Sequence, residues 1–436
     1  DDATRAICLY IEGLLDGARF RRAAAACRAA KKPLVVLKSG RTDAGVVATR
    51  SHTASLAGSW EVFAAVCREH GVVIAKDPDD MVRSAHFLTQ FPGPRRTSRV
   101  ALLSSSGGGG SIGADRVSEL GTELATLSDA TRQALEVMLL APQAVNPVDL
   151  GGRRVAQNVE IAFDTTRILP ADDAVGYGLA FLMSMPFYLK RTMAVAEAAQ
   201  ASRKPVLIAC TPGAAADPAR QELRKLGLVT FDSFEQALRV LASMVEYGRM
   251  QAERHEPPVR PGGLPESSAL AALSAGAQTE SEVKRLLARY GIAVAREAFA
   301  ATPKAAGEAA RTIGFPVVLK AQSHDIVHKS DVGAVVVGLA DAAAVSAAAD
   351  AMRKRLDTEL PEARVEGYSV QEMVRGEAEV IIGVRRDPQF GPIVLVGLGG
   401  IAVEILHDVV VLPAPTTAER VRGSIARLRT APLFAG

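Results

Sequence analysis

Cysteine, aromatic residues and net charge are all scarce in this chain. Its four cysteines, Cys8, Cys27, Cys67 and Cys210, are scattered and form no C-x-x-C pair. This spacing argues against a disulfide framework or a zinc site and indicates buried thiols in a reducing cytoplasm. The formal charge of +3, with no basic run among the aromatic residues, gives no support for a nucleic-acid surface.

The sequence also predicts no signal peptide, and it contains no long uninterrupted apolar run. Its longest weakly charged stretch, Gly391 to Leu406, contains Pro392, Glu404 and four glycines. Such a stretch does not predict a membrane span. What is abundant is small and aliphatic: 48% of the residues are hydrophobic and only 5% aromatic. A core of alanine, valine and leucine favours layered α/β domains.

Two segments near the amino terminus place a carboxylate and a histidine at one edge of a predicted sheet. The apolar runs 6–11 and 33–37 are typical of neighbouring parallel strands, and Glu12 follows the first. After the second come a glycine loop and the octet 51–58, S-H-T-A-S-L-A-G, which predicts a helix start. Since ligands of open α/β sheets lie outside the carboxyl ends of the strands, we expect Glu12 to orient His52 for nucleophilic attack. The alternatives are a surface or N-cap histidine and an exposed loop carboxylate.

A second α/β unit is predicted after the turn 92–94. Its strand, 99–103, is followed by the glycine loop Ser104–Ser111 and by a helix expected from about Ile112 to Leu120. Glycines between a strand and a helix let the backbone approach a phosphate, whose charge the helix dipole favours. The loop lacks the G-x-x-x-x-G-K-[ST] spacing, so it predicts no P-loop. A plain tight turn is equally compatible with it.

These segments resemble the NDP-forming acyl-CoA synthetases, relatives of succinyl-CoA synthetase. The resemblance extends through Lys32-Pro33, Ser104 to Asp115, the N-P-V-D segment 146–149 and most of 267–415. In that family the histidine of the octet is phosphorylated and an upstream glutamate holds its imidazole. The resemblance therefore implies catalytic roles for His52 and Glu12. It also implies a phosphate site at the glycine loop, made by Ser106, Gly107, Gly108, Gly109, Gly110 and Ser111.

The fold implied is α/β, with two flavodoxin-like (succinyl-CoA synthetase-like) domains followed by an ATP-grasp domain. We expect these domains at 1–92, 97–250 and 267–436, with a proline-rich linker at 251–266. The chain enters a core strand at once, without an initiator methionine. The family's CoA-binding domain and its D-x-N-P magnesium segment have no counterpart in 1–436. We therefore expect the first and last domains to be incomplete.

The last domain carries the residues that the resemblance assigns to nucleotide. In ATP-grasp proteins the lysine ending a G-F-P-V-V-L-K strand binds phosphates, and here it is Lys320. The following hinge would supply Glu372, Met373 and Val374 to adenine, and Glu379 to the ribose. A lysine is a point charge for phosphate and a carboxylate accepts hydroxyl donors, although solvent-facing strand-end charges are the alternative.

A second histidine enters through the same resemblance. In ADP-forming members an H-K-[ST]-D-x-G-G loop carries a histidine that relays the phosphoryl group. The corresponding residue here is His328, and Ala334 replaces the second glycine of the loop.

The implied activity is that of an acyl-CoA synthetase (ADP-forming), an acid–thiol ligase working through phosphohistidine and acyl phosphate. Its ligands would be ATP/ADP, Mg²⁺, CoA and a small carboxylic acid that no motif specifies. We expect a cytoplasmic homodimer or higher homo-oligomer without nucleic-acid or membrane partners. One alternative is a non-catalytic, synthetase-like regulatory region of a protein lysine acetyltransferase. Another is a nucleotide-binding scaffold that has lost turnover.

Overall fold

The structure is a computed structural model that describes most of the chain. The described residues are 1–47, 58–93, 95–152, 157–183, 188–253, 258–265, 278–326, 329–374, 376, 378–400, 406 and 408–434. His52 and His328 lie outside them. Contacts divide the chain into two compact units, Asp1–Pro258 with Val380–Gly436, and Val259–Glu379.

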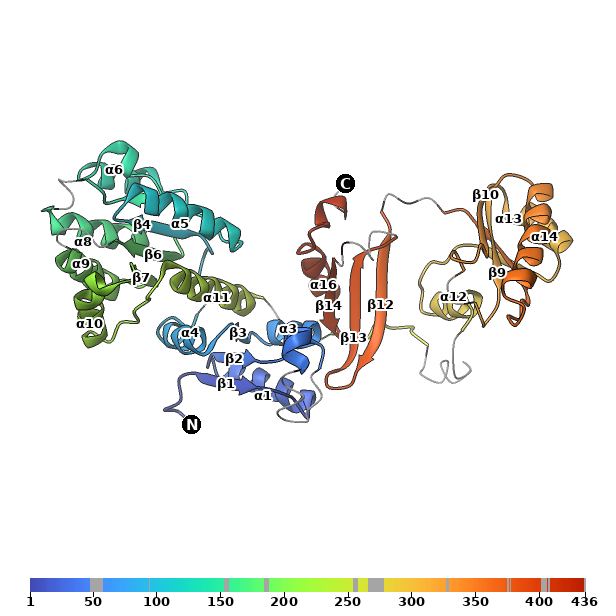
Figure 1. Cartoon of the computed structure of the whole chain (residues 1–436), viewed down its shortest axis with the longest axis horizontal. Coiled ribbons are helices and arrows are strands. Elements are labelled where there is room, and N and C mark those ends of the chain that lie inside the picture. Colours follow the sequence, from blue (N-terminus) through green and yellow to red (C-terminus); the bar gives the residue numbers. More distant parts are fainter. Residues whose placement is uncertain are drawn as a thin grey trace. The chain divides into compact units, whose positions relative to one another are not determined.

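The first unit opens with a parallel sheet in the order β1-β2-β3 (Figure 1). Its strands are β1 Ile7–Ile11, β2 Leu34–Lys38 and β3 Val73–Ala75, and its helices are α1 Gly17–Ala29, α3 Trp60–Glu69 and α4 Pro78–Gln90. Ile7 pairs with Leu34 and Ile11 with Lys38, so the two predicted strands are parallel neighbours. This confirms that Glu12 and the loop after β2 leave the sheet at the same edge.

A second parallel sheet has the order β5-β4-β6-β7. Its strands are β4 Val100–Ser104, β5 Val148–Asp149, β6 Tyr177–Leu182 and β7 Val206–Cys210. Its helices are α5 Gly107–Glu119, α6 Asp129–Glu136, α8 Val159–Ile168, α9 Tyr188–Gln200, α10 Asp217–Lys225 and α11 Phe234–Ala252. Short 3-10 turns lie at Ala141–Gln143, Leu169–Ala171, Ala214–Ala216 and Ala431–Phe434. β4 is buried along its whole length, as a strand covered on both faces must be.

The carboxyl-terminal part of the first unit is an antiparallel sheet in the order β12-β13-β14. Its elements are β12 Val380–Asp387, β13 Gly391–Leu398, β14 Val409–Pro413 and the helix α16 Ala418–Ile425. Phe390 packs against Phe20 and Phe63, with ring centroids 6.5 and 6.4 Å away. Arg420 lies 2.8 Å from Glu69. These contacts join the β12–β14 sheet to the core of the first parallel sheet.

The second unit is an antiparallel sheet in the order β10-β9-β11-β8. Its elements are α12 Glu280–Arg289, β8 Glu297–Ala300, α13 Pro303–Ile313, β9 Val317–Gln322, β10 Val335–Leu339, α14 Ala342–Glu359 and β11 Gly367–Glu372. Along β9, buried Val317, Leu319 and Ala321 join the core with α13 and α14. Because strand side chains alternate between faces, Lys320 points to the opposite face.

The predicted α/β fold class is confirmed, with two parallel flavodoxin-like sheets preceding antiparallel ones. The division between compact units falls at Glu379–Val380, inside the predicted ATP-grasp domain, and the domain bounds stay predictions. All four cysteines are free thiols. Among the described residues, no helix is long and apolar enough to cross a membrane.

Candidate functional site

The carboxyl edge of the first sheet gathers a carboxylate and a buried lysine. Lys38 ends β2, is 6% exposed and donates through Nζ to the Glu12 carbonyl oxygen at 2.8 Å. The Tyr10 hydroxyl donates to Glu12 Oε1 at 3.1 Å. Burial lowers the pKa of Lys38, while the Glu12 charge acts in the opposite direction. Sequence reasoning missed Lys38, although it ends an apolar strand. The prediction that Lys320 also ends its strand was wrong, because β9 continues to Gln322.

A pocket of about 380 Å³ opens at this edge. Charged and hydroxyl-bearing residues form much of its wall: Tyr10, Lys38, Ser39, Arg41, Thr42, Lys76 and Asp77. Three cations around one pocket suit an anionic group. Since His52 lies outside the described residues, its contact with Glu12 stays a prediction.

The glycine loop of the second sheet is largely helical. α5 begins at Gly107, five residues before the predicted start at Ile112, so that prediction was wrong. Ser106 has extended backbone angles, and its hydroxyl accepts a hydrogen bond from Gly109 N at 3.5 Å. This N-cap offsets the low helix propensity of the glycines. The first backbone N–H groups of the helix have no intrahelical acceptor, which makes this end suitable for an anion.

The glycines of α5 differ in whether packing would leave room for a side chain. A Cβ on Gly109 would lie 2.9 Å from Ser104 Oγ, and one on Gly113 would lie 2.5 Å from Leu102 Cδ2. These two positions allow the helix to pack closely on β4. A Cβ on Gly108 would have no neighbour nearer than 3.9 Å, so packing does not require glycine there. The Ser111 hydroxyl donates to Gly107 O at 3.3 Å and is thus engaged within its own helix.

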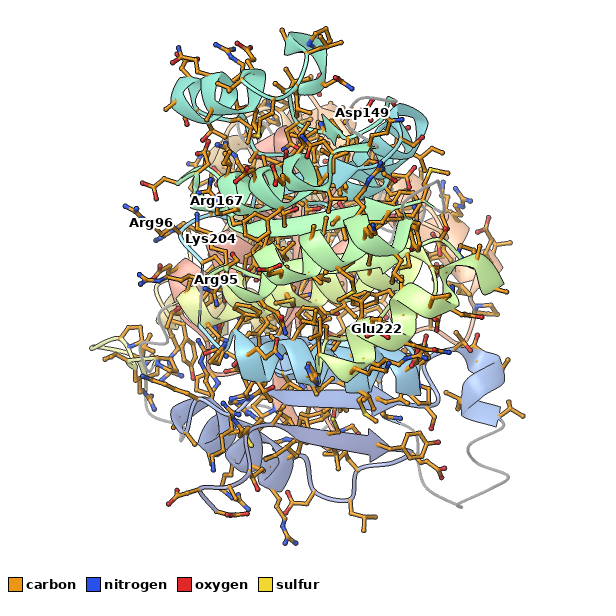
Figure 2. The ribbon with its side chains drawn as sticks, turned by 90° about the vertical axis from the view of Figure 1, so that its left-hand side faces the viewer. Arg95, Arg96, Asp149, Arg167, Lys204 and Glu222 are labelled. Carbon is orange, nitrogen blue, oxygen red and sulfur yellow. The ribbon has the colours of Figure 1, made fainter. Side chains whose placement is uncertain are left out.

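Asp149, labelled in Figure 2, borders the same helix start. A Cβ on Gly107 would lie 3.2 Å from Asp149 Oδ2, and Asp149 Oδ1 accepts from Gly151 N at 2.7 Å. Asn146 has a structural role, because its Nδ2 donates to the carbonyl oxygens of Val100 and Ala125 at 2.8 and 2.9 Å. The N-P-V-D segment therefore ties its loop to β4 and presents one carboxylate at the sheet edge.

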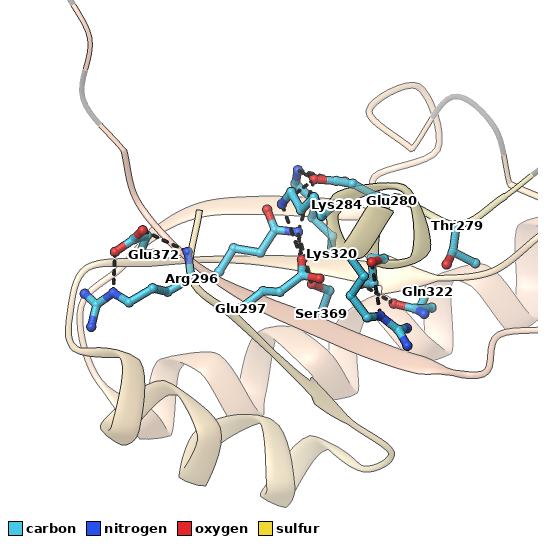
Figure 3. A network of polar contacts seen from close by, with 12 residues as sticks. Thr279, Glu280, Lys284, Arg296, Glu297, Lys320, Gln322, Ser369 and Glu372 are labelled. Carbon is cyan, nitrogen blue, oxygen red and sulfur yellow. Dashed lines mark hydrogen bonds and ion pairs between the residues drawn. The ribbon is translucent and has the colours of Figure 1, made fainter. Parts of the chain in front are cut away.

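Lys320 takes part in a network on the open face of the second unit (Figure 3). Its Nζ lies 2.8 and 3.0 Å from the two carboxylate oxygens of Glu280, which starts α12. Lys284, one helical turn later, lies 2.9 Å from Glu280 and 3.3 Å from Glu297. The Gln371 amide donates to Glu280 and to Glu297, at 3.2 Å in both cases. Two lysines therefore share two carboxylates.

The charge of Glu280 is strongly stabilised. Burial alone would raise the pKa of its carboxyl, but the hydrogen bonds and charges of Lys320 and Lys284 outweigh this and lower it to about 2. A strongly shifted pKa in a half-buried polar cluster is typical of functional sites, although structural ion pairs can produce the same shift. Glu280 and Lys284 were missed from the sequence because their helix precedes β9 by some thirty residues.

The other predicted nucleotide residues lie along the end of β11. The Glu372 carboxylate accepts hydrogen bonds from Arg296 N and Nε, at 2.8 and 2.6 Å. Both of its oxygens are therefore already hydrogen-bonded to Arg296. Met373 and Val374 are 39% and 69% exposed, and Glu379 is also exposed. Their roles toward adenine and ribose stay predictions.

No metal site is formed by the described part of the chain. Within it, no group of three or more histidine, cysteine, aspartate or glutamate residues is arranged to hold an ion.

Two family models match the chain. Residues 1–88 match the succinyl-CoA ligase-like flavodoxin domain, and residues 269–436 match an ATP-grasp domain. The ADP-forming acetate–CoA ligase I of Archaeoglobus fulgidus is 32% identical over all of this chain, which spans 63% of that relative's length. The beta subunit of the ADP-forming acetate–CoA ligase I of Pyrococcus furiosus is 38% identical over 36% of this chain and 68% of its own length.

A solved structure has a similar fold. It is the dinucleotide-forming acetyl-coenzyme A synthetase 1 of Ca. Korarchaeum cryptofilum in complex with phosphate and ADP, with a TM-score of 0.52 and 22% identity. The match covers 58% of this chain and 55% of that one. With one segment that matches the succinyl-CoA ligase-like flavodoxin domain, another that matches an ATP-grasp domain, and 32% and 38% identity to these two ligases, the chain belongs to the NDP-forming acyl-CoA synthetase family, which includes the ADP-forming acetate–CoA ligases.

Proposed function

We propose that the complete protein is an acyl-CoA synthetase (ADP-forming). It would convert a carboxylic acid, CoA and ATP into acyl-CoA, ADP and phosphate. The observation that carries this proposal is the Lys320 network, because it places a partly exposed lysine among polar side chains on one face of β9, within the segment matched by the ATP-grasp model. Family membership supplies the reaction class.

The chemistry divides one difficult exchange into displacement steps. A histidine nitrogen attacks the γ-phosphorus of ATP, the bond to the β–γ bridging oxygen breaks and ADP leaves. The phosphoryl group then passes from nitrogen to a carboxylate oxygen of the acid, giving an acyl phosphate. Attack of the CoA thiolate on the acyl carbon releases phosphate and forms the thioester. We assign His52 to the transfer to the acid and His328 to the relay from nucleotide.

Other side chains would stabilise these steps. Glu12 would hold the His52 imidazole, and Lys38, beside Glu12, would raise the local positive potential. The start of α5 at Ser106–Gly110 would stabilise phosphoryl charge through backbone N–H groups. Lys320 would bind the nucleotide phosphates, with Glu372, Met373, Val374 and Glu379 around the nucleoside. Since the nucleotide and His52 segments belong to different compact units, the phosphoryl group must be carried between them.

The test is incubation of the full chain with γ-labelled ATP. We expect an acid-labile, base-stable phosphoprotein, as phosphohistidine requires. His52→Ala should abolish stable labelling, and His328→Ala should slow its appearance. His86→Ala, an exposed histidine of α4, is the matched control and should label like the parent chain. A label that persists in His52→Ala would refute the assignment.

We further propose the domain bounds 1–92, 97–250 and 267–436 and a homodimer or higher homo-oligomer in the cytoplasm. Light scattering on the complete protein tests the assembly, and a monomeric mass at micromolar concentration would contradict it. Mg²⁺ would be held chiefly by the ATP phosphates, since no group of three or more histidine, cysteine, aspartate or glutamate residues in the described part of the chain is arranged to hold an ion.

A further inference from the structure

Arg191 is a buried cation with no counter-charge among the residues that the structure describes. It lies in the first turn of α9 and is 3% exposed. Within the described part of the chain its Nη2 has no hydrogen-bond partner, and no carboxylate forms an ion pair with it. A guanidinium stays protonated at neutral pH, so this charge cannot be removed by proton loss. Buried charges are normally paired, because their desolvation is costly.

Arg220, in the same domain, shows what a structural buried arginine has around it. It is 5% exposed and lies 2.7 Å from Asp217 and 3.5 Å from Asp232. Its guanidinium also donates to the carbonyl oxygens of Thr211 and Gly213, at 3.0 and 3.2 Å. Its charge is therefore compensated by the protein itself, whereas no described residue compensates the charge of Arg191.

Arg191 lies near the carboxyl edge of the second sheet, the edge at which α/β sheets bind ligands. α9 follows the carboxyl end of β6, and α5 follows that of β4, so both helices begin at the edge where α/β sheets bind ligands. Met183 N donates to Ser105 Oγ at 2.8 Å, which joins the loop after β6 to the loop before α5. On α8, which packs against α9, the buried Thr165 Oγ1 also has no hydrogen-bond partner among the described residues.

We propose that Arg191 is the cationic half of a buried oxyanion site that takes a carboxylate or phosphate group. The start of α9 would add the favourable end of its helix dipole. An oxyanion would supply both the missing charge and the missing hydrogen-bond acceptors. This inference rests on the proposed function, in which the acid and the released phosphate both present such a group. Burial lowers the pKa of Arg191, which agrees with an environment that lacks an anion.

Thermal unfolding of the full chain, with and without millimolar inorganic phosphate or acetate, tests the proposal. A functional cation is held at a cost in stability, so Arg191→Met should unfold at a higher temperature than the parent chain when no anion is added. Phosphate or acetate should raise the unfolding temperature of the parent chain by about 2 °C or more. Arg191→Met should lose this rise and Arg191→Lys should keep less than half of it. The anion with the larger shift identifies the group preferred.

The matched control is Arg167→Met. Arg167 lies on α8, is 59% exposed in its side chain and pairs with Asp164 at 3.0 Å (Figure 2). It should respond to anions like the parent chain. A lower unfolding temperature of anion-free Arg191→Met, or an unchanged anion response in Arg191→Lys, would overturn the proposal and make Arg191 a structural residue. The unfolding measurement contains neither ATP nor CoA, so its outcome does not depend on whether a histidine is phosphorylated. Failure of the labelling experiment and failure of the anion-site proposal can therefore be distinguished.

Discussion

At the scale of single residues, Glu280 has the most informative environment. Its carboxylate forms ion pairs with both Lys320 and Lys284, so loss of one ion pair would still leave the carboxylate paired with the other lysine. If Lys320 binds a nucleotide phosphate, as we propose, Lys284 would still neutralise the charge of Glu280. This arrangement avoids the penalty of an unpaired, half-buried carboxylate.

The pH dependence of stability should reveal this carboxylate. Its pKa of about 2 is below the ordinary glutamate value, so the stability it contributes is present above about pH 4.3 and is lost as the pH falls toward 2. Glu280→Gln should flatten the unfolding temperature in that acidic window relative to the parent chain. Glu308→Gln, on the exposed side of α13, should not. Identical acid profiles for parent and Glu280→Gln would contradict the assignment.

Lys320 should contribute directly to nucleotide affinity. A charge-assisted contact to phosphate is worth about 1.5–3 kcal/mol, so Lys320→Met should weaken ATP binding about 10- to 100-fold. Isothermal titration of the full chain measures this. Lys304→Met, an exposed lysine of α13, is the control and should bind as the parent does. Equal affinities in all three proteins would remove Lys320 from the nucleotide site.

At the scale of elements, α5 shows why a glycine-rich helix forms. A Cβ on Gly113 would lie 2.5 Å from Leu102 Cδ2 and 3.0 Å from Phe234 Cζ, whereas one on Gly108 would have no neighbour nearer than 3.9 Å. One glycine is required by packing of the helix on β4. The other leaves the helix start open to a ligand.

Two alanine substitutions in α5 should therefore have opposite effects on stability. Gly113→Ala should destabilise by about 1–3 kcal/mol through overpacking. Gly108→Ala should stabilise by up to about 1 kcal/mol through helix propensity. Urea unfolding of both variants measures the difference, and a destabilised Gly108→Ala would contradict the open environment described for that residue.

At the scale of the whole molecule, the β12–β14 sheet belongs to the core of the first unit. Phe390 lies 5% exposed among the rings of that core, although it is more than 300 residues away from them in sequence. A segment that the family model assigns to the ATP-grasp domain therefore shares a hydrophobic core with the flavodoxin-like domain.

Truncation of Phe390 should loosen this shared core. Phe390→Ala removes a buried ring, which typically costs about 3–5 kcal/mol. Hydrogen exchange should accelerate in β13 and in α3, while β9 and β11 of the other unit keep their protection. Phe299→Ala, a 56% exposed phenylalanine of β8, should change neither region. Faster exchange in β9 after Phe390→Ala would mean that the two units are not independent.

The sequence by itself determined the strands β1, β2, β4 and β9, the parallel pairing of β1 with β2 and the family, because hydrophobic periodicity and short motifs are local properties. It also indicated Glu12, which follows β1, and Lys320, which lies in β9. Only the tertiary structure decided that α5 starts at Gly107, that Glu280 binds both Lys284 and Lys320, and that Phe390 joins the first core. The same holds for Arg191, which has no counter-charge among the described residues. Each of these depends on groups distant in sequence, and desolvation and ion pairing act on distances in space.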